Sequence, residues 1–305
     1  MGKEYSVFIG EVALDEYYET DRWPGIADKA EVETLPAVPG GMTANAACVF
    51  ASLGNEVKFC TALRHSDITS FLLRDLQSYG IDTSMIVYDD TLTDAKTMIF
   101  LCNGEHTILI PLQHLEKVEI TDEQLLVLKN AKFIFSTAGS LSLLHCGELS
   151  WKEIAAECRA NGVRVACDFD VDYERNGDDG RFETVDIAFF NEVGYDSVRE
   201  GRTYDEEAEH LMSIGVSHVV VTLAEKGCII YDRDGKHVSA ARRTEVVDVT
   251  GAGDTFCASF TAMLDELGVE EAAKFAHTAA SLCIGKQGAR AGAVGKEKIL
   301  ECMKE

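Results

Sequence analysis

The sequence of 305 residues is poor in basic residues and in long apolar runs, and each of these shortages argues against one class of protein. Basic residues are few: 28 Lys and Arg stand against 52 Asp and Glu, for a formal net charge of −24. A nucleic-acid-binding surface needs a basic patch to neutralise phosphates, so no nucleic-acid partner is expected. No apolar run approaches the roughly 20 residues of a membrane-spanning helix, so no membrane partner is expected either.

Cysteine, histidine and phosphate-loop motifs are also missing. The ten cysteines form no CxxC pair and the eight histidines no HExxH pattern, so a dedicated zinc site is not expected. The lack of GxxxxGK[ST], and of GxGxxG after the first strand-like segment, disfavours P-loop ATPases and nicotinamide oxidoreductases. Scattered cysteines among apolar residues, with no secretory leader pattern, predict reduced thiols and a cytoplasmic location.

Strand-like and helix-like segments alternate along the chain. The strand-like segments are short and rich in Val, Ile and Phe, which is typical of parallel strands covered on both faces; they are residues 5–10, 57–63, 131–137, 163–170, 185–191 and 217–223. Between them lie helical patterns, several ending at glycine, at residues 43–54, 68–80, 149–162 and 205–215. The alternation predicts an α/β fold with a doubly wound, mainly parallel sheet and ligand sites at the strands' carboxyl ends.

Two segments interrupt this alternation, at about residues 16–38 and 94–112. Both have partly alternating patterns, and the second turns at Asn103-Gly104, a strong hairpin signal. They are expected to form either a small inserted β-sheet, serving as a lid or dimer contact, or ordinary edge hairpins.

Two glycine turns carry the candidate chemistry. Thr250-Gly251-Ala252-Gly253 precedes a helical pattern, so its backbone N–H groups can form an anion site at a helix N-terminus. Asp254 follows directly and can take a proton from a hydroxyl that attacks a bound phosphate, or it can simply cap the helix. The second turn, Gly40-Gly41, stands before Asn45, and Asp15 follows the first strand. The side-chain amide of Asn45, the carboxylate of Asp15 and the glycine backbone can hydrogen-bond to vicinal hydroxyls of a ligand, although each of these residues is also common in turns and caps.

Together these stretches resemble the ribokinase-like, or phosphofructokinase B, family of carbohydrate kinases over essentially the whole chain. Residues 10–15 are similar to the family's first-strand substrate motif, residues 40–54 to its first signature and residues 248–256 to its second. The inserted β segments fall where the family carries its lid. The resemblance therefore implies a single ribokinase-like kinase domain over residues 1–305.

The resemblance also implies residue roles. Asp254 would be the catalytic base, and the amides of Gly251, Ala252 and Gly253 would hold the transferring phosphoryl group. The sugar would be bound by Asp15, Gly40, Gly41 and Asn45, and by Asp168 if it lines the pocket rather than only ending a strand. The nucleotide would contact Asn191, Thr222, Ala224, Gly227 and Thr250. The implied cofactors are ATP, Mg²⁺ and a monovalent cation such as K⁺, with Asp248 and Glu192 as metal-binding candidates.

Three positions depart from the family pattern. Gly194 replaces the acid of the N-x-x-E motif, and Glu192 is the candidate to compensate. Ala224 stands where the nucleotide loop often has glycine, and it can pass the phosphates if its φ is negative. Residues 64–70 lack both glycines of the family's G-x-D-x-x-G, which favours an unusual substrate.

The sequence thus predicts an ATP-dependent kinase acting on a hydroxymethyl group of a sugar or sugar-like substrate, and a homodimer through the lid. A nucleoside kinase stays open because Tyr17, Tyr18 and Trp23 in the first lid segment could stack on a base. A catalytically weakened sugar-binding or regulatory homologue also stays open, because of Gly194 and Ala224.

Overall fold

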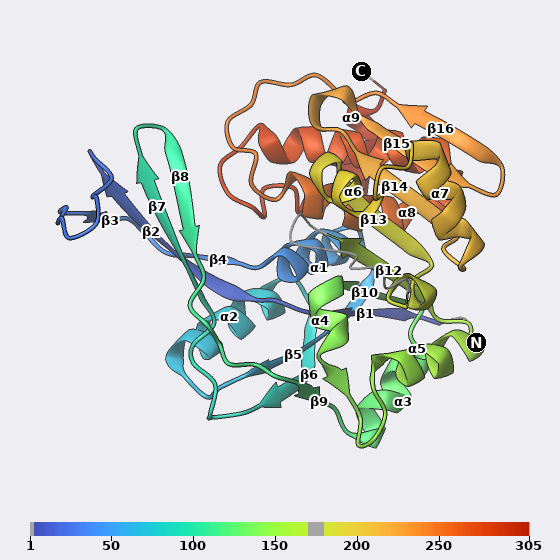
Figure 1. Cartoon of the computed structure of the whole chain (residues 1–305), viewed down its shortest axis with the longest axis horizontal. Coiled ribbons are helices and arrows are strands. Elements are labelled where there is room, and N and C mark those ends of the chain that lie inside the picture. Colours follow the sequence, from blue (N-terminus) through green and yellow to red (C-terminus); the bar gives the residue numbers. More distant parts are fainter. Residues whose placement is uncertain (1–2, 170–179, 305) are drawn as a thin grey trace.

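The computed structural model describes residues 3–169 and 180–304, which form a nine-stranded main sheet and a smaller five-stranded sheet (Figure 1). The main sheet has the order β16-β15-β14-β13-β12-β10-β1-β5-β6 and is parallel from β14 to β6. Its strands are β1 (Tyr5–Ile9), β5 (Glu56–Leu63), β6 (Asp82–Tyr88), β10 (Phe133–Thr137), β12 (Arg164–Phe169), β13 (Ile187–Asn191), β14 (His218–Thr222), β15 (Cys228–Asp232) and β16 (Gly235–Ser239). All six predicted strands are present, although the last residue of one, Asp170, lies outside the described residues.

Helices cover both faces of this sheet, as a doubly wound fold requires. One face packs against α1 (Met42–Ser52), α2 (Asp67–Ser78), α8 (Ala252–Ile284) and α9 (Lys296–Cys302). The other packs against α3 (Asp122–Asn130), α5 (Trp151–Ala160), α6 (Glu192–Val198) and α7 (Tyr204–Ser213). Shorter elements are α4 (Ala138–Ser142), the 3₁₀ turns η1 (Phe182–Thr184) and η2 (Ala224–Lys226), and the paired strands β9 (Val118–Glu119) and β11 (Leu144–His145).

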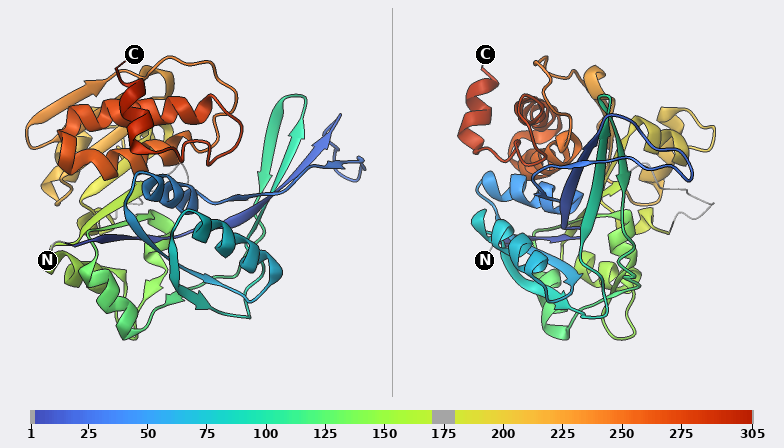
Figure 2. Two further views of the ribbon diagram at one scale, coloured as in Figure 1. Left: turned by 180° about the vertical axis from the view of Figure 1, so that it is seen from behind. Right: turned by 90° about the vertical axis from the view of Figure 1, so that its left-hand side faces the viewer.

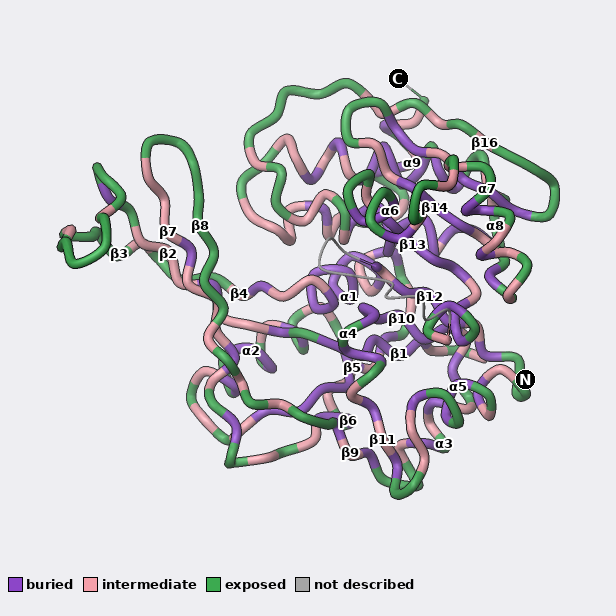
Figure 3. Tube along the Cα trace, viewed as in Figure 1, coloured by how far each residue is buried: buried purple, intermediate pink, exposed green. Residues whose placement is uncertain are grey.

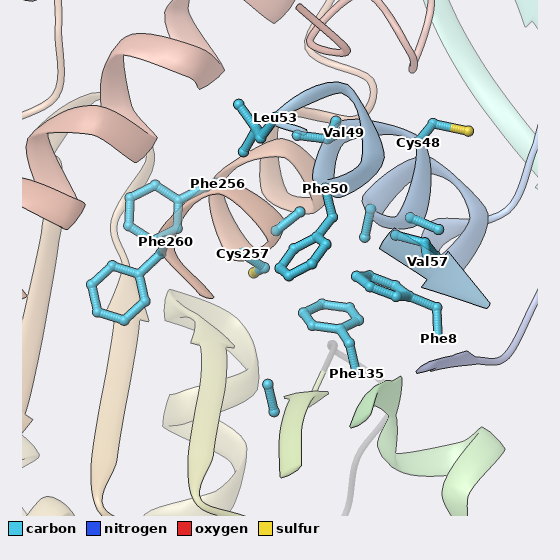
Figure 4. Close-up of a cluster of buried hydrophobic side chains, with 14 of the residues drawn as sticks. Phe8, Cys48, Val49, Phe50, Leu53, Val57, Phe135, Phe256, Cys257 and Phe260 are labelled. Atoms are coloured by element: carbon cyan, nitrogen blue, oxygen red, sulfur yellow. The ribbon is translucent and has the colours of Figure 1, made fainter. Parts of the chain in front are cut away.

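The alternation of side chains along β1 divides the core into two layers. Phe8 points toward α1, where its ring lies 5.0 Å from Phe135 and 5.2 Å from Phe50 (Figure 4). Val7 and Ile9 belong to the core on the opposite face. Strands buried on both sides explain the near-continuous apolar runs in the sequence.

The two interrupting segments meet in the small sheet. It contains β2 (Ala13–Thr20), β3 (Glu33–Thr34), β4 (Val38–Gly40), β7 (Lys96–Cys102) and β8 (Glu105–Leu109). Asn103 and Gly104 both have positive φ, 53° and 82°, as a tight hairpin turn between β7 and β8 requires. The predicted small inserted sheet is therefore confirmed, and it projects from the main body with much of its surface exposed (Figures 2 and 3).

All ten cysteines are free, and nine of them are buried. Across the part of the chain that the structure describes, none of the helices combines the length and apolar character needed to cross a bilayer.

Candidate active site

Asp15 lies on β2, where the small sheet leaves the main body. Its side chain is buried beside β4, and a Cβ placed on Gly40 would lie only 2.0 Å from Asp15 Oδ2. Burial raises the pKa of Asp15, while a hydrogen bond from Thr97 and the charge of Arg290 act in the opposite direction. Because only glycine leaves room for this carboxylate, the Gly40 backbone and Asp15 form one closely packed wall.

Asn45 lies on α1 and faces the start of α8. Gly41 precedes α1 as its N-cap with φ 97°, and a Cβ there would lie 2.6 Å from the carbonyl oxygen of Glu11. Asn45 Nδ2 donates to Asp254 Oδ2 at 2.9 Å. Two residues predicted at the site from separate stretches of sequence therefore contact each other directly.

The glycine turn before Asp254 forms the N-terminus of α8. Gly251 is the N-cap with φ 77°, and a Cβ there would lie 2.1 Å from the carbonyl oxygen of Ala289. Asp254 therefore lies inside the first turn and is not the helix cap, which excludes the simpler interpretation of this residue. The N–H of Ala252 donates to Val249 at 3.2 Å, whereas that of Gly253 has no acceptor among the described residues.

A pocket of about 120 Å³ joins the two predicted halves of the site. Asp254 and Asp168 line it together with Asn191 and Thr222, which the sequence assigns to the nucleotide. Asp168 is the penultimate residue of β12 and pairs with Thr137, the last residue of β10, so it stands at the carboxyl edge of the sheet. Cys257 Sγ lies 3.8 Å from Asp168 Oδ2.

A larger cavity of about 420 Å³ opens on the nucleotide side. Asn191, Thr222, Ala224 and Gly227 line it together with Gly253 of the glycine turn. Thr250 is absent from this lining; it lies at the surface, where its N–H donates to Asp248. The cavity therefore brings four of the five predicted nucleotide residues together.

The backbone of Ala224 differs from the expectation. Its φ is +49°, not negative, so this alanine adopts the left-handed conformation that glycine accommodates best. Gly227, three residues on, has φ 103° and approaches β16 so closely that a Cβ would lie 2.0 Å from the carbonyl oxygen of Ser239. The condition under which Ala224 was expected to pass the phosphates is therefore not met, although Ala224 and Gly227 both line the nucleotide-side cavity.

Both metal-binding candidates, Glu192 and Asp248, already have partners within the protein. Glu192 pairs with Lys226 at 3.4 Å and lines the nucleotide-side cavity. Burial acts to raise the pKa of Asp248, but hydrogen bonds from Gly288 and Thr250 lower it below its usual value. Among the described residues, no three His, Cys, Asp or Glu side chains gather in a way that could hold a metal ion.

Sequence patterns missed three residues of this region. Arg290 contacts Asn45 and Gly40, and Glu11 accepts hydrogen bonds from the hydroxyls of Thr43, Thr137 and Ser140. His277 lines the nucleotide-side cavity, its ring 4.9 Å from that of Phe256. Only Glu11, which follows Gly10 at the end of the first strand, had a positional signal in the sequence.

Comparisons with known proteins show that this fold is shared with sugar and nucleoside kinases. Residues 3–294 match the family model for pfkB family carbohydrate kinases, so the chain belongs to this family. It is an ATP-dependent carbohydrate kinase, a phosphotransferase that acts on an alcohol group.

Individual relatives and solved structures are similar to this chain over nearly its whole length. It is 26% identical to a ribokinase of Lactococcus lactis, covering 97% of this chain and 96% of the relative. The structure of Arabidopsis thaliana ribokinase complexed with ribose and ATP is similar with a TM-score of 0.85 and 22% identity, covering 100% of both chains. A Methanocaldococcus jannaschii nucleoside kinase is similar with a TM-score of 0.82 and 19% identity, covering 100% of this chain and 99% of that one. The predicted fold is therefore confirmed.

Proposed function

We propose that this kinase transfers the γ-phosphoryl group of ATP to a hydroxymethyl group of an uncharged sugar, with Asp254 as the general base. The observation that carries the proposal is the position of Asp254. It lies in the first turn of α8, is hydrogen-bonded by Asn45, and shares a pocket with residues of the nucleotide-side cavity. A carboxylate at this junction can receive the proton of a hydroxyl that faces the phosphate.

The reaction then needs little beyond positioning and charge stabilisation. The sugar oxygen forms a bond to the γ-phosphorus, its proton passes to Asp254, and the bond from that phosphorus to the bridging oxygen breaks to release ADP. The N-terminus of α8 would face the negative charge that spreads over the phosphoryl oxygens, and the Gly253 N–H there has no acceptor among the described residues. Asp15, Gly40, Gly41 and Asn45 would hold the other sugar hydroxyls.

The described residues suit a Mg²⁺ ion that arrives with the nucleotide. Such ions bind mainly phosphate oxygens and water, with only one or two carboxylates, so no protein-only cage is needed. Glu192 would be the nearby carboxylate, because it lines the nucleotide-side cavity. When bound, Mg²⁺ would neutralise phosphate charge. Asp248 and Thr250 would frame the site of a monovalent cation such as K⁺.

Charge around the pocket favours a neutral substrate. Asp168 and Asp254 line the smaller pocket, Asp15 is buried beside Gly40, and Glu11, just after β1, lines a separate cavity. A phosphate or carboxylate on the substrate would therefore meet like charges, and Arg290, the cation closest to Asn45 and Gly40 among the described residues, is already paired with Asp75.

A nucleoside is the second candidate substrate, and Tyr17 is the observation in its favour. Tyr17 lies on β2, two residues from Asp15 and on the same face of the strand. Burial raises the pKa of its phenol, and the charges of Asp15 and Asp248 add to this effect. The other two aromatic residues of the segment, Tyr18 and Trp23, instead pack on Phe100 within the small sheet.

The decisive experiment measures ADP release with ATP and Mg²⁺ across sugars, sugar acids, sugar phosphates and nucleosides, for the wild type and Asp254→Asn. We expect turnover of a neutral sugar, reduced about 10²–10⁴-fold by the substitution while sugar binding persists. The matched control is Asp265→Asn, which removes another carboxylate of α8, one that pairs with Arg164 of β12. Near-normal turnover by Asp254→Asn would disprove the base assignment. Thermal shifts with sugars but no ADP release from the wild type would indicate a binding homologue.

We also propose that the small sheet acts as a lid and pairs two copies of the chain. All five residues of β8 are exposed, including Ile108 and Leu109, and the edge strand has unpaired backbone groups that a second copy could cover. Sedimentation of the wild type and Leu109→Glu tests this: we expect a dimer that the charged side chain weakens, and a monomeric wild type would contradict it.

A further inference from the structure

Arg290 joins four segments of the chain beneath the proposed sugar site. It lies in the loop after α8, and its side chain is only 9% exposed. Its Nε donates to Asn45 Oδ1 at 3.2 Å, its Nη2 donates to the carbonyl oxygen of Gly40 at 3.3 Å, and its Nη1 pairs with Asp75 of α2. The planar guanidinium therefore makes two hydrogen bonds and one ion pair to three different segments, which a lysine could not reproduce.

The chemistry of these groups fixes the orientation of the Asn45 amide. A guanidinium has only donors, so it must face the amide oxygen, whereas a carboxylate at neutral pH has only acceptors, so it must face the amide nitrogen. Asn45 lies between the two, and only one of its two orientations satisfies both neighbours. The reversed orientation would set oxygen against the Asp254 carboxylate and hydrogen against the guanidinium.

We propose that Arg290 is a positioning residue of this kinase: by holding the Asn45 oxygen, it directs the Asn45 amide N–H to Asp254 and so sets the orientation of the base. Arg290 itself does not touch the reacting atoms. Its ion pair with Asp75 holds the guanidinium in place, and its bond to Gly40 ties the same group to the wall behind Asp15. The loop that carries it is anchored at the active site, because the Gly288 N–H donates to Asp248.

The catalytic part of this inference rests on the proposed function, so its test uses two independent readouts. The first is a double-mutant cycle of kcat/KM with Arg290→Met, Asn45→Ala and the double variant. We expect each single substitution to lower kcat/KM at least about tenfold, and Arg290→Met to cost less than about twofold once Asn45 is gone, since contacting residues couple. Independent effects that multiply in the double variant would overturn the inference.

The second readout needs no turnover. The side-chain NH₂ signals of Asn45 in a ¹H–¹⁵N spectrum should be sharp, slowly exchanging and unequal in shift in the wild type. In the folded Arg290→Met variant, the chemical shifts and exchange rates of these Asn45 signals should move toward those of an asparagine side chain that rotates freely. Unchanged Asn45 signals in that variant would overturn the inference even if no substrate is ever found.

Two controls separate positioning from folding. Arg164→Met removes a guanidinium that pairs with Asp265 and stacks on Phe133, and it should change neither readout. Asp75→Asn keeps Arg290 but removes its ion-pair partner, so it should reproduce part of the Arg290→Met change in the Asn45 signals. A wild-type spectrum after Asp75→Asn would show that the ion pair plays no part and would refute that step.

Discussion

A Cβ on Gly40 would lie 2.0 Å from Asp15 Oδ2, so the backbone of β4 and the carboxylate of β2 share a space that excludes any side chain. Gly40→Ala must therefore displace Asp15, and we expect the KM for the sugar to rise at least about tenfold while the KM for ATP stays nearly constant. Steady-state kinetics in both substrates measure this. The control is Gly25→Ala, whose new methyl group meets no atom within 4 Å. Equal effects on both KM values would contradict this role of Gly40.

Glu11 should set the preference for uncharged substrates. Three hydroxyls hold its carboxylate at the end of β1, in the lining of a cavity of about 550 Å³. Glu11→Gln removes the charge with little change in shape, so the ratio of kcat/KM for a sugar phosphate to that for the neutral sugar should rise about tenfold. Glu266→Gln, which breaks a pair with Lys296, should leave the ratio unchanged. No change in the ratio with Glu11→Gln would argue against the charge as a selector.

Ala224 should carry removable backbone strain. Its φ of +49° disfavours any residue with a Cβ, so Ala224→Gly should increase the free energy of unfolding by about 1 kcal/mol. Urea denaturation measures the change. The same substitution at the exposed Ala156 in the middle of α5 should instead lower stability by about 0.5–1 kcal/mol. Destabilisation by both substitutions would show that the Ala224 loop is not strained.

His277 should make the free energy of unfolding decrease as the pH falls below 6.5. Burial lowers its pKa from 6.5 to about 4. Between these two values the unfolded chain binds the proton and the folded chain does not, so this histidine's contribution to stability is complete above pH 6.5. It is lost as the pH falls, by at most about 3 kcal/mol at pH 4.

The free energy of unfolding of His277→Gln, followed from pH 7 to pH 4, isolates this contribution. The variant should lose less stability than the wild type over that range, because glutamine does not titrate. His106→Gln, on the exposed strand β8, should follow the wild type. Parallel curves for wild type and His277→Gln would refute the assignment.

Much of the fold could be predicted because its signals are local. The apolar runs at β1, β10 and β13 follow from strands covered on both faces, and Asn103-Gly104 specifies its hairpin through backbone geometry alone. Asp15 was also predicted, because it follows the first strand, and Asn45 and Asp254 were predicted because each follows a glycine turn. Their roles in binding and catalysis stay predictions until the experiments above are done.

The contacts among these residues could be seen only in the tertiary structure. Asn45 and Asp254 are 209 positions apart in sequence, and Arg290 is 245 positions from Asn45, so no local pattern records their contacts. The φ of Ala224 is likewise set by the loop around Gly227 and not by alanine's own preference. The α/β sheet and the glycine turns could be predicted from the sequence, because both depend on neighbouring residues. The orientation of the Asn45 amide and the ion pair behind it depend on groups that only folding brings together.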